Sequence, residues 1–204
     1  MHQEFHQPPG TYNQYPPYQR TREMSLTDML LENRIIFLAG PIVESSASIV
    51  VQQLLYLQSV RRDQDVNLYI NSPGGLVDQT LAIYDTMQFV GSKVATYCIG
   101  QAASGAALIL MAGTRGKRFI LPNAKVMLHQ PYGGITGQAE DIRIQADEVL
   151  RDKARMNRII SECTGHPVDQ VAADTERDRY MSAEEALEYG VVDELLKDDD
   201  AKKK

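Results

Sequence analysis

Residues 66–89 read VNLYINSPGGLVDQTLAIYDTMQF, which predicts a strand, a tight turn and a helix in succession. In the first part, Val66, Leu68 and Ile70 alternate with more polar residues, as in a strand with one buried face. The Asn-Ser-Pro-Gly-Gly run that follows is typical of a turn. Apolar residues then recur at helical spacing over residues 77–89. A strand that leads directly into a helix is the unit from which α/β folds are built.

The same alternation of strand-like and helix-like segments extends on both sides of this stretch. We expect helices at residues 26–31, 47–56, 104–111 and 138–163 and after the capping pair Ser182 and Glu185, and strands at residues 34–38, 94–99, 118–121, 126–129 and 191–196. Strands that alternate with helices of ~10–15 residues indicate βαβ units and a mostly parallel sheet. The pattern therefore predicts the α/β fold class.

The 204-residue chain has the size of one ordinary globular domain. Hydrophobic residues make up 43% of it, which is enough for a sizeable core. Its 27 acidic and 21 basic residues give a formal net charge of −6, which disfavours a nucleic-acid partner. No apolar run is long enough to span a membrane, and we expect no secretory signal, because no charged start precedes an apolar stretch.

The chain has two cysteines, Cys98 and Cys163, and neither belongs to a CxxC or Cys/His cluster. This arrangement excludes a disulfide scaffold and a structural zinc site. We therefore expect a cytoplasmic protein that holds no metal.

Composition divides the chain into three parts. Residues 1–22 are rich in Pro, Tyr and Gln and lack apolar periodicity, so we expect a disordered or cleavable N-terminal arm. Residues 198–204 are almost entirely Asp and Lys and predict a charged, solvated tail. Residues 23–197 remain as the single folded domain.

The predicted helix at residues 138–163 is unusually long, and Gly165 and Pro167 follow it as stop signals. At 1.5 Å per residue it would extend ~39 Å, which is longer than a domain of this size needs. We expect it to project from the domain and to pack against another chain.

Ser104 is the first candidate catalytic residue, because it lies between a predicted apolar strand and a predicted helix and is flanked by small residues. A serine there can present its hydroxyl to a substrate, while the first N–H groups of the helix favour a developing anion. The alternative is an N-cap serine in a close-packed turn. The pattern also differs from the Gly-x-Ser-x-Gly elbow of α/β-hydrolases, since Ala102 occupies the first glycine position.

His129 is the second candidate, because it ends a predicted strand, where catalytic groups of open α/β sheets often lie. The alternative is a core histidine bonded to the backbone. The charged run from Asp174 to Arg179, which we expect to be a loop between two helices, offers a carboxylate that could orient the imidazole. Charge runs are usually solvated faces, and spacing alone does not choose between Asp174 and Asp178.

The Pro-Gly-Gly turn adds a potential oxyanion donor. Pro73 presets the turn, and the absence of a side chain on Gly75 lets its N–H approach a ligand closely. The N–H groups of Gly75 and Gly105 would then face one developing oxyanion beside Ser104. A phosphate-binding loop is the competing interpretation, but neither GxGxxG nor GxxxxGK[ST] occurs in the chain.

Several motifs in a fixed order resemble those of a known family. They are YINSPGG at 69–75, IYDTMQ at 83–88, QAAS at 101–104, GKRF at 116–119, MLHQP at 127–131, GG at 133–134, DTERDR at 174–179 and EYG at 188–190. This set is similar to that of the ClpP family, the proteolytic subunits of ATP-dependent Clp proteases, over nearly all of residues 25–196. The resemblance implies a ClpP/crotonase-like fold of stacked ββα units with a projecting handle helix at about residues 130–165.

The resemblance also implies a role for each candidate. The family nucleophile corresponds to Ser104, its base to His129 and the aspartate of the triad to Asp178. Its oxyanion donors correspond to the backbone N–H groups of Gly75 and Gly105. The chain departs from the usual pattern, because most relatives have Met and then Gly after the serine where this chain has Gly and then Ala.

The family architecture further implies two interfaces. The handle helix interlocks two stacked seven-membered rings, and Gln138, Asp141 and Arg177 would join the contacts between rings. The clefts that receive loops of an AAA+ unfoldase correspond to Tyr69, Phe89, Phe119, Leu121 and Leu196.

The function implied is that of a serine endopeptidase that hydrolyses unfolded polypeptides inside a double-ring chamber and needs no cofactor. ATP would be used by the partner unfoldase and not by this chain. Two alternatives are a crotonase-type acyl-CoA enzyme, which shares the fold and a two-amide oxyanion hole, and a non-catalytic structural subunit of a Clp assembly. The presence of Ser104, His129 and Asp178 argues against both.

Overall fold

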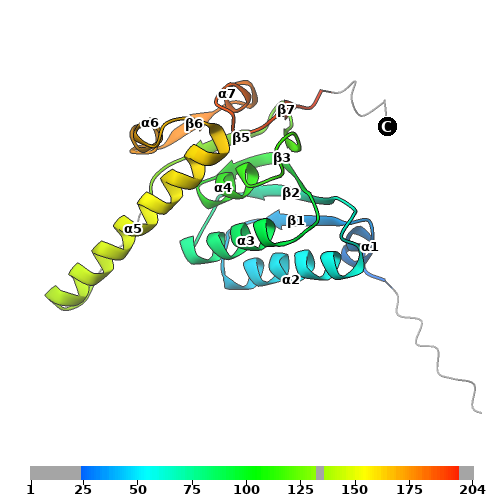
Figure 1. Ribbon diagram of the computed structural model, residues 1–204, viewed down its shortest axis with the longest axis horizontal. Helices are drawn as coiled ribbons and strands as arrows, with labels where there is room; N and C mark the ends of the chain where they lie inside the picture. The colour runs from blue at the N-terminus through cyan, green and yellow to red at the C-terminus, as the bar shows by residue number, and fades with distance from the viewer. Residues whose placement is uncertain (1–23, 132–135, 198–204) are drawn as a thin grey trace, which may run out of the picture.

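The computed structural model describes residues 24–131 and 136–197, and its strands form one mixed sheet (Figure 1). The strands are β1 (Ile35–Ala39), β2 (Val66–Ser72), β3 (Val94–Ala103), β4 (Arg118–Ile120), β5 (Lys125–Leu128), β6 (Arg179–Met181) and β7 (Glu194–Leu195). Strands β1, β2, β3, β4 and β7 lie in that order and are all parallel. The predicted α/β class is confirmed; the predicted arm and tail lie outside the described residues.

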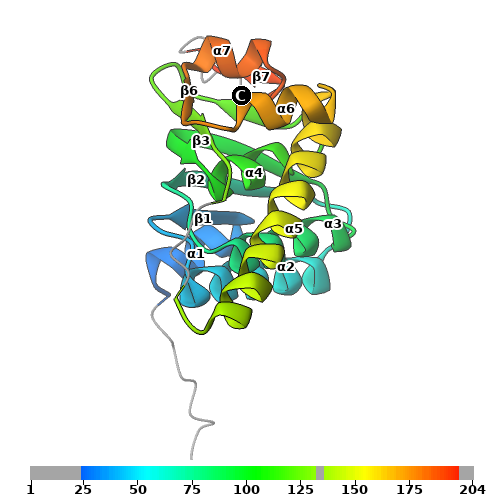
Figure 2. The ribbon, with the colours of Figure 1, turned by 90° about the vertical axis from the view of Figure 1, so that its left-hand side faces the viewer.

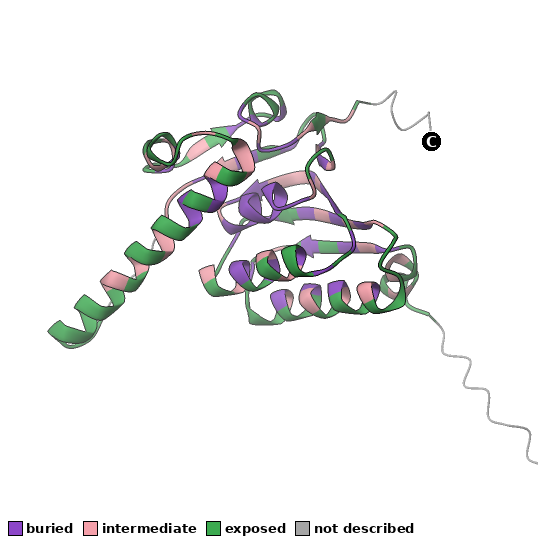
Figure 3. Ribbon diagram, in the orientation of Figure 1, coloured by how far each residue is buried: buried purple, intermediate pink, exposed green. Residues whose placement is uncertain are grey.

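Seven helices belong to the described residues. They are α1 (Leu26–Glu32), α2 (Glu44–Val60), α3 (Val77–Phe89), α4 (Gly105–Met111), α5 (Ala139–Thr164), α6 (Val168–Asp174) and α7 (Ala183–Glu188). The predicted capping boxes are present at α1 and α7, where Ser25 and Ser182 accept hydrogen bonds from the N–H groups three residues on. Helices α2 and α3 lie along one side of β1 and β2, and every residue of α4 is buried (Figures 1 and 3).

Strand β2 shows why this sheet has an apolar face towards the helices. Val66, Leu68 and Ile70 are buried, while Asn67 and Tyr69, which point to the opposite face, are half exposed. The period of two places alternate side chains on opposite faces of a strand, so the three apolar residues join the core.

The opposite face of the sheet has a ladder of four aromatic rings, which we call the aromatic ladder. It consists of Phe37, Tyr69, Tyr97 and Phe119, one from each of β1 to β4, at positions that pair directly between neighbouring strands. Adjacent ring centroids are 5.4, 4.6 and 4.9 Å apart in stacked geometry. Phe37 leaves 46% of its surface exposed, so the ladder reaches the molecular surface.

Helix α5 projects from the body of the molecule, as predicted (Figures 1 and 2). Its buried residues, Met156, Asn157, Ile159 and Ile160, all lie in the C-terminal half, which packs near α4 and α6. The N-terminal half is mostly exposed and includes the apolar residues Ile144 and Leu150 (Figure 3). The helix therefore has an apolar stretch that the other described residues leave exposed.

Three differences from the sequence prediction bear on the sheet and the site. Strand β3 continues to Ala103, four residues beyond the predicted end, because β5 pairs with its last residues. The predicted strand at 191–196 is reduced to Glu194–Leu195. The charged run at 174–179 lies between helix α6 and strand β6 rather than between two helices, because Arg179 begins a strand that pairs with β5.

Candidate active site

Ser104 occupies a strained junction between β3 and α4. Its backbone has φ 55° and ψ −125°, a conformation that is rare for a residue other than glycine. Ser104 is the N-cap residue of α4, but its side chain makes no capping hydrogen bond. Its N–H donates to Met127 O at 2.8 Å, which fixes the junction to the neighbouring strand. The nucleophilic serine of α/β-hydrolases lies on a similarly strained turn, although the glycine signature of that turn is absent here.

His129 is brought to the same edge of the sheet by strand pairing. Strand β5 runs parallel to the end of β3, with Ala103 opposite Met127, so Ser104 and His129 both follow the carboxyl ends of adjacent strands. The His129 side chain is 12% exposed, and its Nδ1 lies 3.2 Å from Asp178 Oδ1. The imidazole is thus hydrogen-bonded to a carboxylate.

Asp178 precedes β6, which pairs antiparallel with β5, and is held there by the preceding loop. Gln130 N–H donates to Thr175 O at 2.7 Å, and the Gln130 side-chain amide donates to Glu176 O at 3.0 Å. Lys153 on α5 bonds the Glu176 carboxylate at 3.0 Å, and this bond and the lysine's charge lower the pKa of Glu176. The loop is therefore attached both to the histidine segment and to α5.

Asp174, the other aspartate that the sequence left open, has different partners. It forms an ion pair with Arg179 and accepts a hydrogen bond from the Tyr189 hydroxyl at 2.8 Å. Burial and this bond to Asp174 raise the pKa of Tyr189. The structure brings Asp178, and not Asp174, to His129.

A cavity of about 430 Å³ opens at the junction. Its lining includes Ser104, Gly105, His129, Gly74, Gly75 and Met156. A second hollow is lined by His129 and Asp178, among others. His129 thus lines the serine cavity and also bonds the carboxylate, as the base of a serine triad must.

The glycine turn lies directly against this junction. Gly75 forms a parallel bridge with Ile42, and a Cβ on Gly75 would lie 2.1 Å from Ile42 O. Gly74 has φ +86°, and a Cβ there would lie 2.7 Å from Ser104 Cβ. The close contact at Gly75 is thus with Ile42. Gly75 and Gly105 both line the Ser104 cavity.

The residues expected at interfaces lie apart from this site. Gln138 caps α5 and Asp141 lies in its first turn, both exposed at the projecting end, whereas Arg177 is exposed beside Asp178. The N-terminal end of α5, which carries Gln138 and Asp141, lies away from β6, which Arg177 precedes (Figures 1 and 2).

The expected docking residues gather only in part. Tyr69 and Phe119 belong to the aromatic ladder, and Leu121 and Leu196 follow β4 and β7, which pair. Phe89 does not join them: it ends α3 and is 77% exposed. The sequence analysis missed Phe37 and Tyr97, which occupy alternate, outward positions of predicted strands and could have been found from that alternation.

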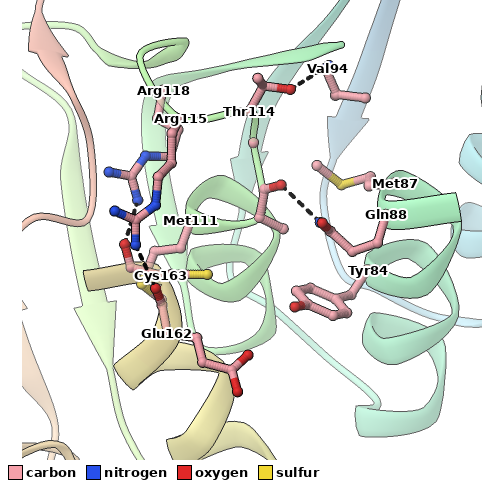
Figure 4. A pocket seen from close by; sticks show the side chains of 12 residues that line it. Tyr84, Met87, Gln88, Val94, Met111, Thr114, Arg115, Arg118, Glu162 and Cys163 are labelled. Atoms are coloured by element: carbon pink, nitrogen blue, oxygen red, sulfur yellow. Dashed lines mark hydrogen bonds between the residues drawn. The ribbon is translucent and has the colours of Figure 1, made fainter. Parts of the chain in front are cut away.

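A separate cavity of about 380 Å³ lies between α3, the end of α4 and the end of α5 (Figure 4). Arg118 and Arg115 line it and donate to Cys163 O and Glu162 O at 3.0 and 2.7 Å. No residue of the candidate triad lines it. Within the described part of the chain no His, Cys, Asp and Glu side chains gather as metal ligands, and each helix is too short or too polar to cross a bilayer.

An α/β sheet with a strained serine, a histidine and a carboxylate at one edge has the arrangement of a serine hydrolase. Comparison with known proteins agrees with this class. The Clp protease family model matches residues 18–199. The chain is also 56% identical to the ATP-dependent Clp protease proteolytic subunit 1 of Rhodopirellula baltica, over 182 residues that cover 89% of this chain and 80% of that protein. The chain belongs to the Clp protease family and is a serine peptidase.

Proposed function

We propose that this chain is the proteolytic subunit of an ATP-dependent Clp protease and that Ser104, His129 and Asp178 form its catalytic triad. The observation that carries the proposal is that the strained Ser104 lines one cavity with His129, and that His129 Nδ1 lies within hydrogen-bond distance of Asp178 Oδ1. His129 takes the Ser104 proton as the oxygen attacks a peptide carbonyl carbon, and then returns it to the leaving amine. Water, deprotonated in the same way, hydrolyses the acyl-enzyme.

The backbone N–H groups of Gly75 and Gly105 stabilise the oxyanion in each step. Gly105 is the first residue of α4, where the N–H groups have no partner within the helix. Gly75 belongs to the turn that packs against Ser104. Two preorganised backbone donors are the usual construction of an oxyanion hole, and removing one such donor costs about 10²–10³-fold in kcat.

The assembly consists of two stacked heptameric rings joined through the α5 handles. The exposed apolar residues of α5 support this arrangement, because an apolar helical stripe that projects from its own domain needs a partner. Gln138, Asp141 and Arg177 add polar contacts between the rings. The substrates are unfolded polypeptides that enter the enclosed chamber, and a cytoplasmic location stays a prediction.

An AAA+ unfoldase docks on the outward face of the sheet and hydrolyses the ATP, so this chain needs no cofactor. Tyr69, Phe119, Leu121 and Leu196 form the docking surface, to which the aromatic ladder adds Phe37 and Tyr97. Phe89 projects from the end of α3, so it reaches such a surface only on a neighbouring copy.

The test is the variant Ser104→Ala, assayed for peptide cleavage, for labelling by a serine-directed fluorophosphonate probe and for native mass. We expect loss of cleavage and of label, by ~10³-fold or more, with an unchanged assembly. Ser48→Ala, which changes an exposed serine of α2, serves as the control and should keep both activities. Cleavage by Ser104→Ala at the wild-type rate would refute the assignment.

The same experiment separates the two alternatives. A non-catalytic subunit would show no label on Ser104 in the wild-type protein. A crotonase-type enzyme would show a thermal shift with acyl-CoA, which a peptidase would not. Neither alternative is favoured by a specific feature of the described residues.

A further inference from the structure

Thr80 is a buried polar residue in the first turns of α3, just beyond the glycine turn. It is 1% exposed, and its hydroxyl donates to Leu76 O at 3.0 Å. Leu76 is the residue after Gly75, and its N–H donates to Ile42 O at 2.9 Å. Thr80 thus bonds the segment that supplies one of the two proposed oxyanion donors.

The same side chain packs against the other donor. A Cβ on Gly105 would lie 2.3 Å from Thr80 Oγ1, 3.1 Å from Thr80 Cγ2 and 3.2 Å from Thr80 Cβ. Real Cβ atoms do not approach other atoms to 2.3 Å, so Thr80 occupies the space that a side chain at position 105 would need. The absence of a side chain on Gly105 therefore lets the first turn of α4 lie directly against Thr80.

We infer that Thr80 is a positioning residue of the oxyanion hole, one that sets the separation of the Gly75 and Gly105 amides. This inference rests on the proposed function. The Thr80 hydroxyl donates to the carbonyl of Leu76, the residue after Gly75, and the Thr80 side chain packs against Gly105. Oxyanion donors must lie 2.7–3.1 Å from the developing charge. A shift of a few tenths of an ångström in the position of either amide therefore weakens the stabilisation of the oxyanion.

The chain has a matched contact away from the site. Gly113 follows the other end of α4, and a Cβ on it would lie 2.4 Å from Thr96 Oγ1. Thr96 is fully buried and, like Thr80, donates to a backbone oxygen, Leu110 O at 2.8 Å. Gly113 lines the cavity of Figure 4 rather than the Ser104 cavity. Gly113→Ala thus introduces the same kind of clash without touching the proposed donors.

The experiment compares Gly105→Ala alone, Gly105→Ala with Thr80→Ala, and Gly105→Ala with Thr80→Gly. The first meets all three Thr80 atoms, the second removes Oγ1 and Cγ2 and leaves Cβ at 3.2 Å, and the third removes all three. We expect kcat to fall about 10–100-fold in the first, with KM little changed, and to recover stepwise in the other two. The affinity for a peptide aldehyde, whose hemiacetal oxygen occupies the oxyanion hole, should follow kcat.

The control Gly113→Ala should lower the thermal midpoint while kcat and aldehyde affinity remain at wild-type values. Thr80→Val, which keeps the shape of Thr80 and removes its hydroxyl, tests the bond to Leu76 O if Gly105→Ala does not fold. We expect it to weaken aldehyde binding more than substrate binding. Equal weakening of both would overturn the inference.

Failure of this inference differs from failure of the proposed function. If Ser104→Ala still cleaves peptide, both are wrong. If Ser104→Ala is inactive but Gly105→Ala keeps its kcat, or if the Thr80 changes restore nothing, the positioning role of Thr80 alone is wrong. Stepwise recovery in both kcat and aldehyde affinity supports it.

Discussion

Leu128 and Arg179 pair across the antiparallel strands β5 and β6, and this pair determines which carboxylate reaches the histidine. The next positions outward in the same ladder are His129 and Asp178, whose side-chain atoms lie 3.2 Å apart. A slip of one residue would turn the Asp178 side chain to the other face of the sheet. The register of a three-residue strand therefore fixes the proposed triad.

The first prediction concerns Asp178→Asn. The amide cannot accept the imidazole N–H as a carboxylate does or stabilise its protonated form, so we expect kcat to fall by about 10²–10⁴-fold. Because the Asp178 side chain is 59% exposed, the thermal midpoint should change little. Peptide cleavage and thermal unfolding, measured on the same preparation, check both parts.

Asp174→Asn is the matched control, and it should show the opposite pattern. It weakens the ion pair with Arg179 and the bond from Tyr189, so we expect a loss of about 1–3 kcal/mol in the free energy of unfolding. Its kcat should fall far less than that of Asp178→Asn. A larger loss of kcat in Asp174→Asn would mean that the wrong aspartate has been assigned.

The second prediction concerns assembly through α5. Ile144 and Leu150 are 55% and 63% exposed on the projecting half of this helix. Changing both to Ser removes the apolar contacts proposed between rings, so the native mass should shift from the double ring towards single rings. Ile49→Ser, at an equally exposed position of α2, is the control and should keep the double ring. A double ring in the α5 variant would argue against the handle as the joint.

Much of this fold could be predicted because local patterns and tertiary contacts agree. Helix α3 has the predicted bounds, because its apolar spacing and the preceding Pro-Gly-Gly turn both favour them. The positions of Ser104 and His129 could also be expected, since residues that follow parallel strands meet at one sheet edge. The triad aspartate could not be chosen by spacing, because the run 174–179 contains two aspartates and the short strand β6, whose pairing with β5 brings Asp178 to His129, has no clear pattern.

The strain at Ser104 and the packing of Thr80 on Gly105 were equally inaccessible from the sequence. The glycine signature of a strained elbow is missing, and the strain depends on the bond from Ser104 N–H to a strand 23 residues further along. Thr80 reads as an ordinary residue in a helix. Only the approach of α3 to α4 shows that its side chain fills the space next to Gly105.

The third prediction concerns acid stability through Asp193. Arg118 is 5% exposed and donates to both carboxylate oxygens of Asp193, at 2.9 and 2.5 Å. Burial alone would raise the pKa of Asp193, but the hydrogen bonds and charge of Arg118, with the Gly116 N–H, lower it below its ordinary value. A carboxyl whose folded pKa is lowered stabilises the fold above its unfolded pKa, and this stabilisation is lost as the pH falls through the folded pKa.

Asp193→Asn removes the charge at every pH. We expect it to be less stable than the wild type by about 3 kcal/mol at pH 7, because Arg118 then lies buried without its partner. The difference should shrink as the pH falls below about 4, because the unfolded carboxyl then binds a proton that the folded one, whose pKa is lowered, binds only at lower pH. Urea unfolding of both proteins at pH 7, 5, 4 and 3 measures it. A difference that stays constant down to pH 3 would contradict the prediction.

The fourth prediction concerns the two cysteines, both of which are free thiols. Cys98 is fully buried in β3, and burial raises its pKa to about 11. At pH 8 only about one molecule in 10³ then carries a thiolate at Cys98, and burial also keeps an alkylating reagent away from this sulfur. Cys163 is half buried and lines the cavity of Figure 4, where Arg118 and Arg115 partly offset the rise in its pKa that burial causes. Iodoacetamide should therefore modify Cys163 well before Cys98, as measured by peptide mass after timed quenching.

The variant Cys163→Ser isolates Cys98, the slower thiol, whose modification should accelerate when urea unfolds the protein. Equal modification rates for the two thiols in the native protein would contradict the prediction, because they would show that β3 opens far more readily than its burial implies.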